Sequence, residues 1–185
     1  MKVMPACTTF FEKNLCHLFP LSLLLKKYYA PIVKREVLLG KINEEDQVLC
    51  IGGGALPWTA VEIATQTGAT VHVIDSDPYA VKLASKFIRL LKLEGKVNVR
   101  FGDGQYVDAS GFTVAHIALQ AYPQEKILCH LLQSISRNGR VLVRCPKKRM
   151  ACLYGDCIAP SCLNGKSTKQ SCSTMKETLL FTKYT

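Results

Sequence analysis

Three consecutive glycines end an apolar run in the stretch VLCIGGGALPWTA, and acidic residues end two later apolar runs. Gly52, Gly53 and Gly54 let the backbone approach a ligand closely and adopt positive φ angles. An acidic residue about twenty positions beyond such a loop, here Asp75, is suited to accept hydrogen bonds from ribose hydroxyls. The combination predicts a site for a nucleotide or a nucleoside.

Predicted strands are followed by residues that could contact such a ligand. TVHVI is followed by Asp75, Ser76 and Asp77, and VNVRF is followed by the tripeptide GDG with Asp103 at its centre. Ligands of open α/β sheets bind beyond the carboxyl ends of the strands. For Asp75 and Asp103 the alternative is a capping role without a ligand. We expect the cofactor-binding residues to be Gly52, Gly53, Gly54, Leu56, Pro57, Asp75, Ser76, Asp77, Gly102, Asp103 and Gly104.

The end of the glycine loop distinguishes a dinucleotide site from a nucleoside site. A dinucleotide-binding loop has the spacing G-x-G-x-x-G, which lets the pyrophosphate rest on the helix N-terminus. Here Pro57 stands at the position of the last glycine and lacks a backbone N–H, while Ala55 and Leu56 fill space that a pyrophosphate would need. The loop therefore favours a nucleoside without phosphates.

Strand and helix patterns alternate from Gln47 onward. Pro57 suits the first turn of a helix that ends at Gly68, and Asp77 caps a helix that we expect to end near Gly95. Repeated strand–helix units imply a parallel sheet with right-handed crossovers and helices on both faces. We predict strands at 47–51, 70–75, 97–101, 112–119, 140–145 and 178–184, and helices at 57–68, 77–95 and 124–136.

These elements predict a Rossmann-like, doubly wound α/β fold with a mostly parallel sheet. The last strand, TLLFTKY, is expected to be antiparallel and to form an edge of that sheet. The first 40 residues are predicted to be helical, with interruptions at Pro20 and Pro31. We therefore expect a short helical extension over residues 1–40 and a nucleoside-binding domain over residues 41–185.

VLCIGGG, VHVIDSD and VRFGDG resemble, in the same order, the glycine loop, the ribose acid and the adenine-side motif of class I S-adenosylmethionine-dependent methyltransferases. The resemblance extends from Gln47 to Cys145 and implies the fold of that family, with S-adenosylmethionine as the cofactor. Two positions depart from the family pattern. Cys50 replaces an acidic residue that often precedes the loop, and Leu56 replaces the glycine that closes it.

The stretch IGGGALPWT is similar to the loop IGSGPLPLT of nicotianamine synthase-like proteins, a branch of the same fold. Further similarities are FPLSLLLKKYYAPIVKREV, EKILCHLL, GRVLVR with Arg144, and CLYGD with Leu153 and Tyr154. That branch transfers the aminocarboxypropyl group of S-adenosylmethionine, and not its methyl group, to an amine. The resemblance implies the same reaction here. Methyl transfer to a small molecule and a non-catalytic S-adenosylmethionine-binding module are the alternatives.

Three residues are candidates for catalysis. Tyr29 and Glu36 match the tyrosine and the glutamate that precede the sheet in the nicotianamine synthase-like branch, and the resemblance implies that they handle the substrate amine. Tyr122 follows the fourth predicted strand and could orient the substrate. The alternatives are a surface charge for Glu36 and a half-buried aromatic for Tyr122. For His72, His116 and His130 we expect core or surface roles, with catalysis as the alternative.

The charge distribution limits the partners. The net charge is +10, and basic flanks enclose a slightly acidic centre without interleaved aromatic residues, so a nucleic-acid partner is not expected. Arg144, Lys147, Lys148 and Arg149 favour an acceptor that carries a carboxylate as well as an amine, with a solvated surface as the alternative. No apolar stretch reaches the ~20 residues of a membrane span. We expect a cytoplasmic protein that acts on a small molecule.

The nine cysteines are expected to be reduced, because no secretory segment precedes them. Cys50, Cys129 and Cys145 fall in predicted strands or helices and are expected to be buried. Cys152, Cys157, Cys162 and Cys172 lack the short spacing of a zinc site, so no metal is predicted. Because nicotianamine synthases carry a longer helical N-terminal domain, we expect either the first 40 residues or a second subunit of a homodimer to close the reaction chamber.

Overall fold

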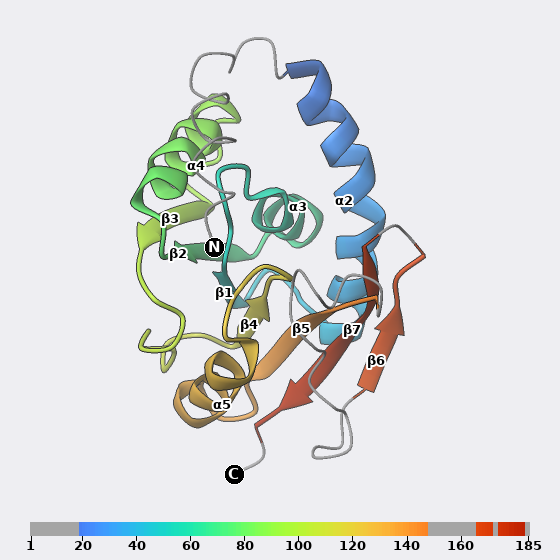
Figure 1. Cartoon of the computed structure of the whole chain (residues 1–185), viewed down its shortest axis with the longest axis vertical. Helices are drawn as coiled ribbons and strands as arrows, with labels where there is room; N and C mark the ends of the chain where they lie inside the picture. Colours follow the sequence, from blue (N-terminus) through green and yellow to red (C-terminus); the bar gives the residue numbers. More distant parts are fainter. Residues whose placement is uncertain (1–18, 148–165, 172–173, 184–185) are drawn as a thin grey trace.

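A computed structural model describes residues 19–147, 166–171 and 174–183. Its centre is a seven-stranded sheet of order β3-β2-β1-β4-β5-β7-β6 (Figure 1). Strands β1 to β5 are parallel, and β7 is antiparallel to both β5 and β6. The strands are β1 (Gln47–Ile51), β2 (Thr70–Asp75), β3 (Val97–Phe101), β4 (Val114–Ile117), β5 (Arg140–Pro146), β6 (Lys166–Lys169) and β7 (Met175–Thr182), and the helices are α2 (Phe19–Gly40), α3 (Trp58–Thr67), α4 (Pro78–Leu90) and α5 (Gln124–Ser134).

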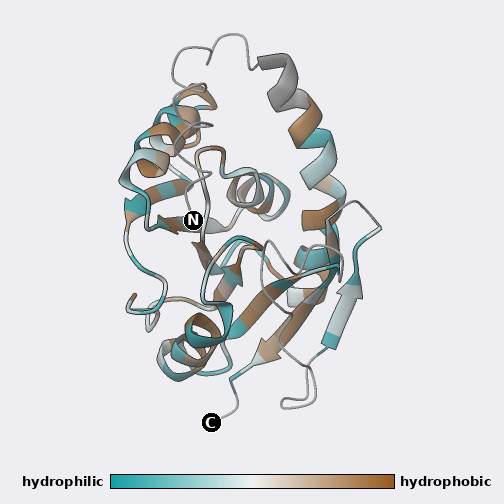
Figure 2. Ribbon diagram, in the orientation of Figure 1, coloured by the Kyte–Doolittle hydropathy of each residue, from teal (hydrophilic) through white to brown (hydrophobic). Residues whose placement is uncertain are grey.

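Both faces of the sheet are buried, because successive side chains of each strand point to opposite faces. Val48 and Cys50 of β1 join the core beneath α2, α3 and α4, whereas Leu49 and Ile51 join the core beneath α5. Figure 2 shows the brown, apolar strands between these two helical layers. The predicted mostly parallel, doubly wound fold with an antiparallel edge is confirmed.

Caps end the helices much as predicted, with one difference in length. Gly68 ends α3 in the left-handed conformation, and the Asp77 carboxylate accepts a hydrogen bond from the N–H of Tyr79 at the start of α4. The second of these helices ends at Leu90, before the expected Gly95. Lys92 has a φ of 56°, which a continuing right-handed helix cannot adopt.

Two other predictions were wrong in detail. Helix α2 continues through Pro31, so that proline does not interrupt it, and Pro20 lies in its first turn, a position that tolerates proline. Strand β7 is internal, because the short strand β6 pairs with it and forms the edge. The sequence KSTK of β6 has neither an apolar run nor a strict alternation, and therefore carried no strand signal.

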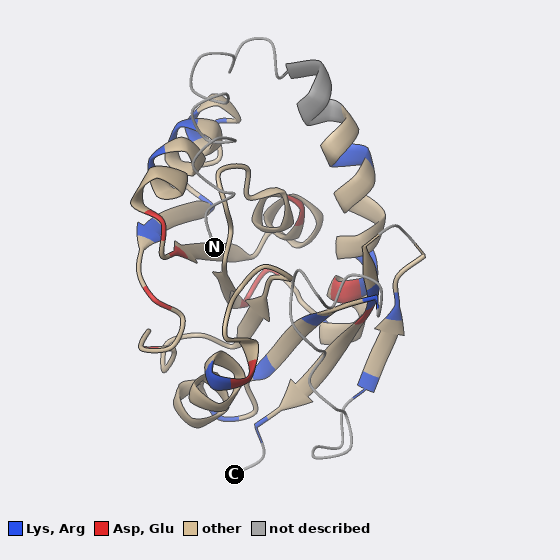
Figure 3. Cartoon of the chain, viewed as in Figure 1, with Lys and Arg blue, Asp and Glu red and all other residues tan. Residues whose placement is uncertain are grey.

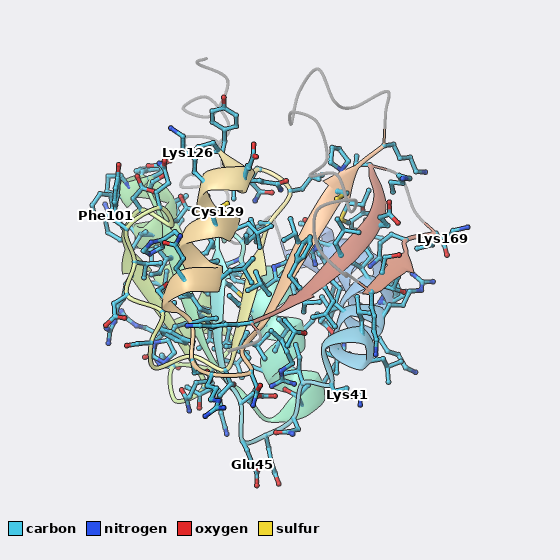
Figure 4. The ribbon with its side chains drawn as sticks, turned by 90° about the horizontal axis from the view of Figure 1, so that it is seen from below. Lys41, Glu45, Phe101, Lys126, Cys129 and Lys169 are labelled. Atoms are coloured by element: carbon cyan, nitrogen blue, oxygen red, sulfur yellow. The ribbon has the colours of Figure 1, made fainter. Side chains whose placement is uncertain are left out.

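The cysteines differ from one another in environment. Cys50 is buried, whereas Cys129, labelled on α5 in Figure 4, is exposed, so the expectation of a buried Cys129 was wrong. Cys145, fully buried in β5, is disulfide-bonded, which overturns the expectation of a reduced thiol there. Four other cysteines of the sequence analysis lie outside the described residues: Cys152, Cys157, Cys162 and Cys172.

Charged residues lie mainly at the periphery. Figure 3 shows basic residues on α4 and β6, near opposite ends of the sheet, with few charges along β1 and β4. Over the described ranges, no helix has the length and apolarity to cross a membrane. The same ranges contain no group of three His, Cys, Asp or Glu side chains that could hold a metal ion.

Candidate nucleoside-binding site

The loop after β1 takes its shape from its three glycines. Gly52 and Gly54 have φ angles of 79° and 63°, in the left-handed region that side chains disfavour. Gly53 is required for a different reason, since a Cβ atom there would lie 2.2 Å from Cγ1 of Val73 in β2. The loop is therefore pressed against β2, and its backbone faces the carboxyl edge of the sheet.

Asp75, the last residue of β2, holds this loop in place through hydrogen bonds to backbone N–H groups. Its Oδ2 accepts a hydrogen bond from the N–H of Gly54 at 2.7 Å, and its Oδ1 accepts one from the N–H of Asp77 at 3.0 Å. An ionised carboxylate has about four acceptor sites, so capacity remains for the two hydroxyls of a ribose. The same carboxylate thus orders the loop and can still bind a ligand.

The first turn of α3 offers few donors to a ligand. Pro57 occupies the N-cap position without a side-chain cap, and proline has no N–H. The N–H of Trp58 already donates to the carbonyl of Leu56 at 2.8 Å. A pyrophosphate at a helix N-terminus needs such N–H groups to be free. The first turn of α3 therefore lacks the free N–H groups of a dinucleotide-binding loop, as the sequence predicts.

A cavity of about 210 Å³ opens between this loop, α2 and the sheet. Its wall at the loop includes the predicted residues Leu56 and Pro57. Its far wall includes Tyr29 of α2, His116 of β4 and Arg144 of β5. The lining residues are Tyr29, Cys50, Ile51, Gly52, Gly53, Gly54, Ala55, Leu56, Pro57, Trp58, Thr59, Ala60, Ala80, His116, Ala118, Gln120 and Arg144.

Glu36 lies behind the far wall in a cage of polar side chains. Arg144 donates to both of its carboxylate oxygens, with Nε–Oε1 and Nη2–Oε2 distances of 2.8 and 2.7 Å. Thr178 of β7 donates to Oε1 at 2.8 Å, and Nε2 of His116 lies 3.2 Å from Oε2. Glu36 is fully buried. The alternative of a surface charge is therefore wrong, and Glu36 is a buried residue that fixes Arg144 at the cavity.

Burial and charge shift the pKa values of this cage in different directions. Burial raises the pKa of Glu36, but Arg144 and then His116 outweigh it, so that pKa lies well below its usual range. Burial lowers the pKa of His116 more than the Glu36 carboxylate raises it. Burial also raises the pKa of the Cys50 thiol to about 12. Glu36 is thus ionised, whereas His116 and Cys50 are neutral near pH 7.

Tyr29 connects the cage to the cavity. Its ring centroid lies 5.7 Å from the guanidinium carbon of Arg144, within the range of a cation–π contact. The ring of Tyr28 packs against it edge-to-face, with centroids 5.1 Å apart. Of the three predicted catalytic residues, the structure brings Tyr29 to the cavity wall and Glu36 to the layer behind it.

The other predicted residues lie at varying distances from the cavity. Tyr122 is 81% exposed and does not line it. Asp103 accepts a hydrogen bond from the N–H of Gln105 at 2.8 Å and shapes an exposed turn. Ser76 and Asp77 follow β2, and Gly102 and Gly104 follow β3, along the same carboxyl edge. Lys148, Arg149, Leu153 and Tyr154 lie outside the described residues.

Gln120 is a cavity residue that the sequence analysis did not select. Its Nε2 donates to the carbonyl of Gly52 at 3.0 Å, so it ties the end of β4 to the glycine loop. His116, for which a structural role was expected, also reaches the wall. The period-2 alternation of a strand could have identified it, because Cys50 and His116 are register partners on one face.

We expect Asp75→Ala to weaken nucleoside binding by roughly 1.5–3 kcal/mol, the range for hydrogen bonds to a charged group. Stability should fall too, since the variant leaves the N–H groups of Gly54 and Asp77 without their partner. Calorimetric titration with S-adenosylhomocysteine measures the affinity. Asp108→Ala is the matched control, because Asp108 accepts from the N–H of Ser110 in a similar turn. Unchanged affinity in folded Asp75→Ala would leave Asp75 with a structural role alone.

Known proteins match this chain both in sequence and in fold. A family model, described as "Alanine dehydrogenase/PNT, C-terminal domain", matches residues 26–124. In sequence, the chain is similar to an L-histidine 2-aminobutanoyltransferase from Yersinia pestis, with 30% identity over 118 residues, 60% of this chain and 42% of that protein. It is also similar to the tRNA (guanine(37)-N(1))-methyltransferase Trm5b from Methanocaldococcus jannaschii, with 31% identity over 88 residues, 46% of this chain and 25% of that protein.

Solved structures share the fold. MtNAS in complex with MTA and tNA has a TM-score of 0.71 and 22% identity, covering 91% of this chain and 62% of that chain. An RNA methyltransferase from Salinibacter ruber in complex with S-adenosyl-L-homocysteine has a TM-score of 0.66 and 22% identity, covering 83% and 91% of the two chains. The chain spans less than half of the length of the two curated relatives that it matches.

Proposed function

The chain belongs to the family of the alanine dehydrogenase/PNT C-terminal domain, and we propose that within this family its glycine loop binds S-adenosylmethionine and not a nicotinamide dinucleotide. The proposal rests on the lack of free N–H donors at Pro57 and Trp58 in the first turn of α3. Pro57 has no N–H, and Trp58 uses its own N–H for the carbonyl of Leu56. The pyrophosphate of a dinucleotide would find neither donor.

Each part of S-adenosylmethionine would bind at a different part of the site. The ribose hydroxyls bind to the free acceptor sites of Asp75, and the adenine lies toward the residues after β3, Gly102 to Gly104. The methionyl end enters the cavity past Gly52 and Gly54, where Gln120 and Arg144 supply polar contacts. Ser76 and Asp77 border the ribose along the same edge. S-adenosylmethionine would supply an activated sulfonium carbon, so the chain's own residues need to position the acceptor and remove a proton.

We infer that the group transferred is the aminocarboxypropyl group. The Yersinia pestis relative is named for the transfer of a 2-aminobutanoyl group, the same four-carbon amino-acid fragment, to L-histidine. MtNAS was solved with MTA, which is the nucleoside left when S-adenosylmethionine loses this fragment. The acceptor nitrogen attacks the γ-carbon of the fragment and forms a C–N bond. The C–S bond breaks, its electron pair stays on sulfur, and the amine loses a proton.

Tyr29 and Glu36 would serve this reaction from the far wall. Tyr29 presents its ring to the cavity beside Arg144, and Glu36 holds Arg144 in place through two hydrogen bonds. The carboxylate of the methionyl end suits this wall. A second subunit would complete the chamber in a homodimer. Tyr122, exposed beyond β4, would contact the acceptor only as it enters.

Methyl transfer is the second candidate. It is favoured by the Salinibacter ruber RNA methyltransferase, of whose chain 91% aligns with this one, and by the tRNA methyltransferase relative. In both cases the nucleoside would occupy the same site. The two reactions differ in the carbon that faces the acceptor, and therefore in the nucleoside that is released.

A thermal-shift series tests the choice of cofactor. We expect S-adenosylmethionine and S-adenosylhomocysteine to raise the melting temperature and NAD to leave it unchanged. Ligand at a hundred times its dissociation constant adds about 2.7 kcal/mol to the free energy of unfolding. Adenosine alone should have a smaller effect, because it lacks the methionyl end. Stabilisation by NAD, with no effect of the adenosyl compounds, would contradict the proposal and favour a dehydrogenase-type cofactor.

A further inference from the structure

Helix α3 carries two buried polar atoms without a partner. Within the described parts of the chain, Nε1 of Trp58 and Oε1 of Glu62 are the buried side-chain nitrogen and oxygen atoms that make no hydrogen bond. The two residues are 4% and 3% exposed. They stand one helical turn apart, at i and i+4, so both project from the same face of the helix. The pair consists of one unused donor and one unused acceptor.

Glu62 is unusual among the acidic residues. A buried carboxylate is normally paired with a basic side chain or fully hydrogen-bonded. Glu36 and Asp46 follow that rule through Arg144 and Arg140. Glu62 receives one hydrogen bond, from Nε2 of Gln66 to its Oε2 at 2.8 Å. No described Lys, Arg or His forms an ion pair with it. Its Oε1 is therefore a buried acceptor that no described group uses.

The pair adjoins the cavity of the proposed cofactor site. Trp58 lines that cavity, and its ring packs edge-to-face on Phe87 of α4, with centroids 5.1 Å apart. Gln66, which donates to Glu62, also donates to the carbonyl of Ala30 at 3.2 Å. Ala30 follows Tyr29, the residue through which α2 reaches the cavity. Glu62 thus lies one turn beyond the wall that Trp58 forms, beside the α2–α3 interface.

We propose that Trp58 and Glu62 form the binding site for the amino-acid acceptor of the transfer reaction. An ammonium group has donors and no acceptor, so it matches Oε1 of Glu62. The indole N–H donates only, so it matches a carboxylate oxygen. The two unpartnered atoms therefore match the two charged ends of an α-amino acid. This inference rests on the proposed function, and it adds the chemical class of the acceptor and the residues that hold it.

Glu62 would also take the proton that the acceptor must lose. The ammonium group gives a proton to Glu62, and the neutral nitrogen attacks the γ-carbon of the aminocarboxypropyl group. A C–N bond forms, the C–S bond breaks, and the electron pair of that bond remains on sulfur as a neutral thioether. The protonated Glu62 then returns its proton to solvent. Every atom and charge in this step comes from the acceptor, the cofactor and one carboxylate.

The test compares Glu62→Gln with the wild type, using S-adenosylmethionine and a panel of amino acids that begins with L-histidine. We expect the KM for the accepted amino acid to rise roughly tenfold to a hundredfold, the effect of losing a hydrogen bond to a charged group. We also expect kcat to fall, because the amide cannot take the proton. The melting-temperature shift caused by S-adenosylmethionine should not change. The variant itself should melt no earlier than the wild type, because the amide removes an unpaired buried charge.

Two further variants make the result specific. Trp58→Phe keeps an aromatic ring against Phe87 and removes only the indole donor, so it should also raise the KM for the amino acid. It keeps the inference testable if Glu62→Gln does not fold. Glu45→Gln is the control, because Glu45 is exposed and points away from the body of the protein in Figure 4. Wild-type turnover with an unchanged KM in the folded variants would overturn this inference alone. Absence of 5′-methylthioadenosine in every wild-type reaction would overturn the proposed function, and this inference with it.

Discussion

Replacing Glu36 with alanine is expected to lower the free energy of unfolding by about 3–5 kcal/mol, the cost of leaving one partner of a buried ion pair uncompensated. Arg144 would keep its positive charge with a side chain that is 4% exposed. Thr178 and His116 would lose their hydrogen-bond partner as well. The free energy of unfolding of a small domain is about 5–15 kcal/mol, so this single change would remove a large part of it.

Urea unfolding at pH 7 measures the effect. Lys176→Ala is the matched control, since Lys176 is 60% exposed in its ion pair with Glu177, and such surface pairs contribute about 0–1 kcal/mol. A double variant, Glu36→Leu with Arg144→Met, should recover part of the loss, because it removes both charges at once. If Glu36→Ala were as stable as Lys176→Ala, the cage would not depend on this carboxylate.

Repeating the unfolding series at lower pH checks the same cage. The pKa of His116 is lower in the folded protein than its ordinary 6.5, so its contribution to stability is complete above that pH and decreases as the pH falls through it. The pKa of Glu36 is lowered from 4.5, so its contribution is complete above 4.5 and decreases below. Stability should therefore fall from about pH 6.5 downward, and more steeply below about pH 4.5.

The second large effect is the identity of the nucleoside product. We expect turnover to release 5′-methylthioadenosine and no S-adenosylhomocysteine. Alkyl transfer proceeds in line, so the carbon that faces the acceptor is the carbon that leaves. The walls next to the methionyl end are apolar at Cys50 and Leu56, where methyltransferases of this fold often carry an acid and a glycine. A differently held tail would turn its γ-carbon toward Trp58 and Glu62.

Chromatography of the reaction mixture separates the two nucleosides. The acceptors to compare are L-histidine, other amino acids, a polyamine and a short RNA. The control reaction contains cofactor and protein without acceptor, which measures spontaneous breakdown of the sulfonium compound. Enzyme-dependent S-adenosylhomocysteine as the sole product would contradict aminocarboxypropyl transfer and support a methyltransferase.

The parallel part of the fold could be predicted because its signals are local. β1, β2 and β3 have the bounds that their apolar runs indicated, and Gly68 and Asp77 mark helix ends through their own backbone and side-chain chemistry. β6 could not be predicted in the same way. Its four polar residues form a strand only because β7 offers an edge with unpaired N–H and C=O groups.

The glycine loop could also be predicted from local sequence, whereas the contacts behind the far wall of the cavity could not. Gly52, Leu56 and Pro57 are neighbours in sequence and their chemistry can be interpreted directly. Glu36 and Arg144 meet across 108 positions, so a tertiary contact alone decides that a helix glutamate is buried. Trp58 and Glu62 showed helical spacing, but no local pattern reveals that their polar atoms lack partners.

The cage around Glu36 also constrains when the protein can complete its structure during synthesis. Thr178 follows Glu36 by 142 positions, and Arg144 follows it by 108. A ribosome therefore releases the carboxylate long before the hydroxyl and the guanidinium that satisfy it. Helix α2 and the first four strands emerge with His116 of β4 as the one described partner of that carboxylate. Burial of the carboxylate without its basic partner Arg144 would be strongly destabilising. Only when β7 has emerged does the growing chain contain every donor that the buried carboxylate needs.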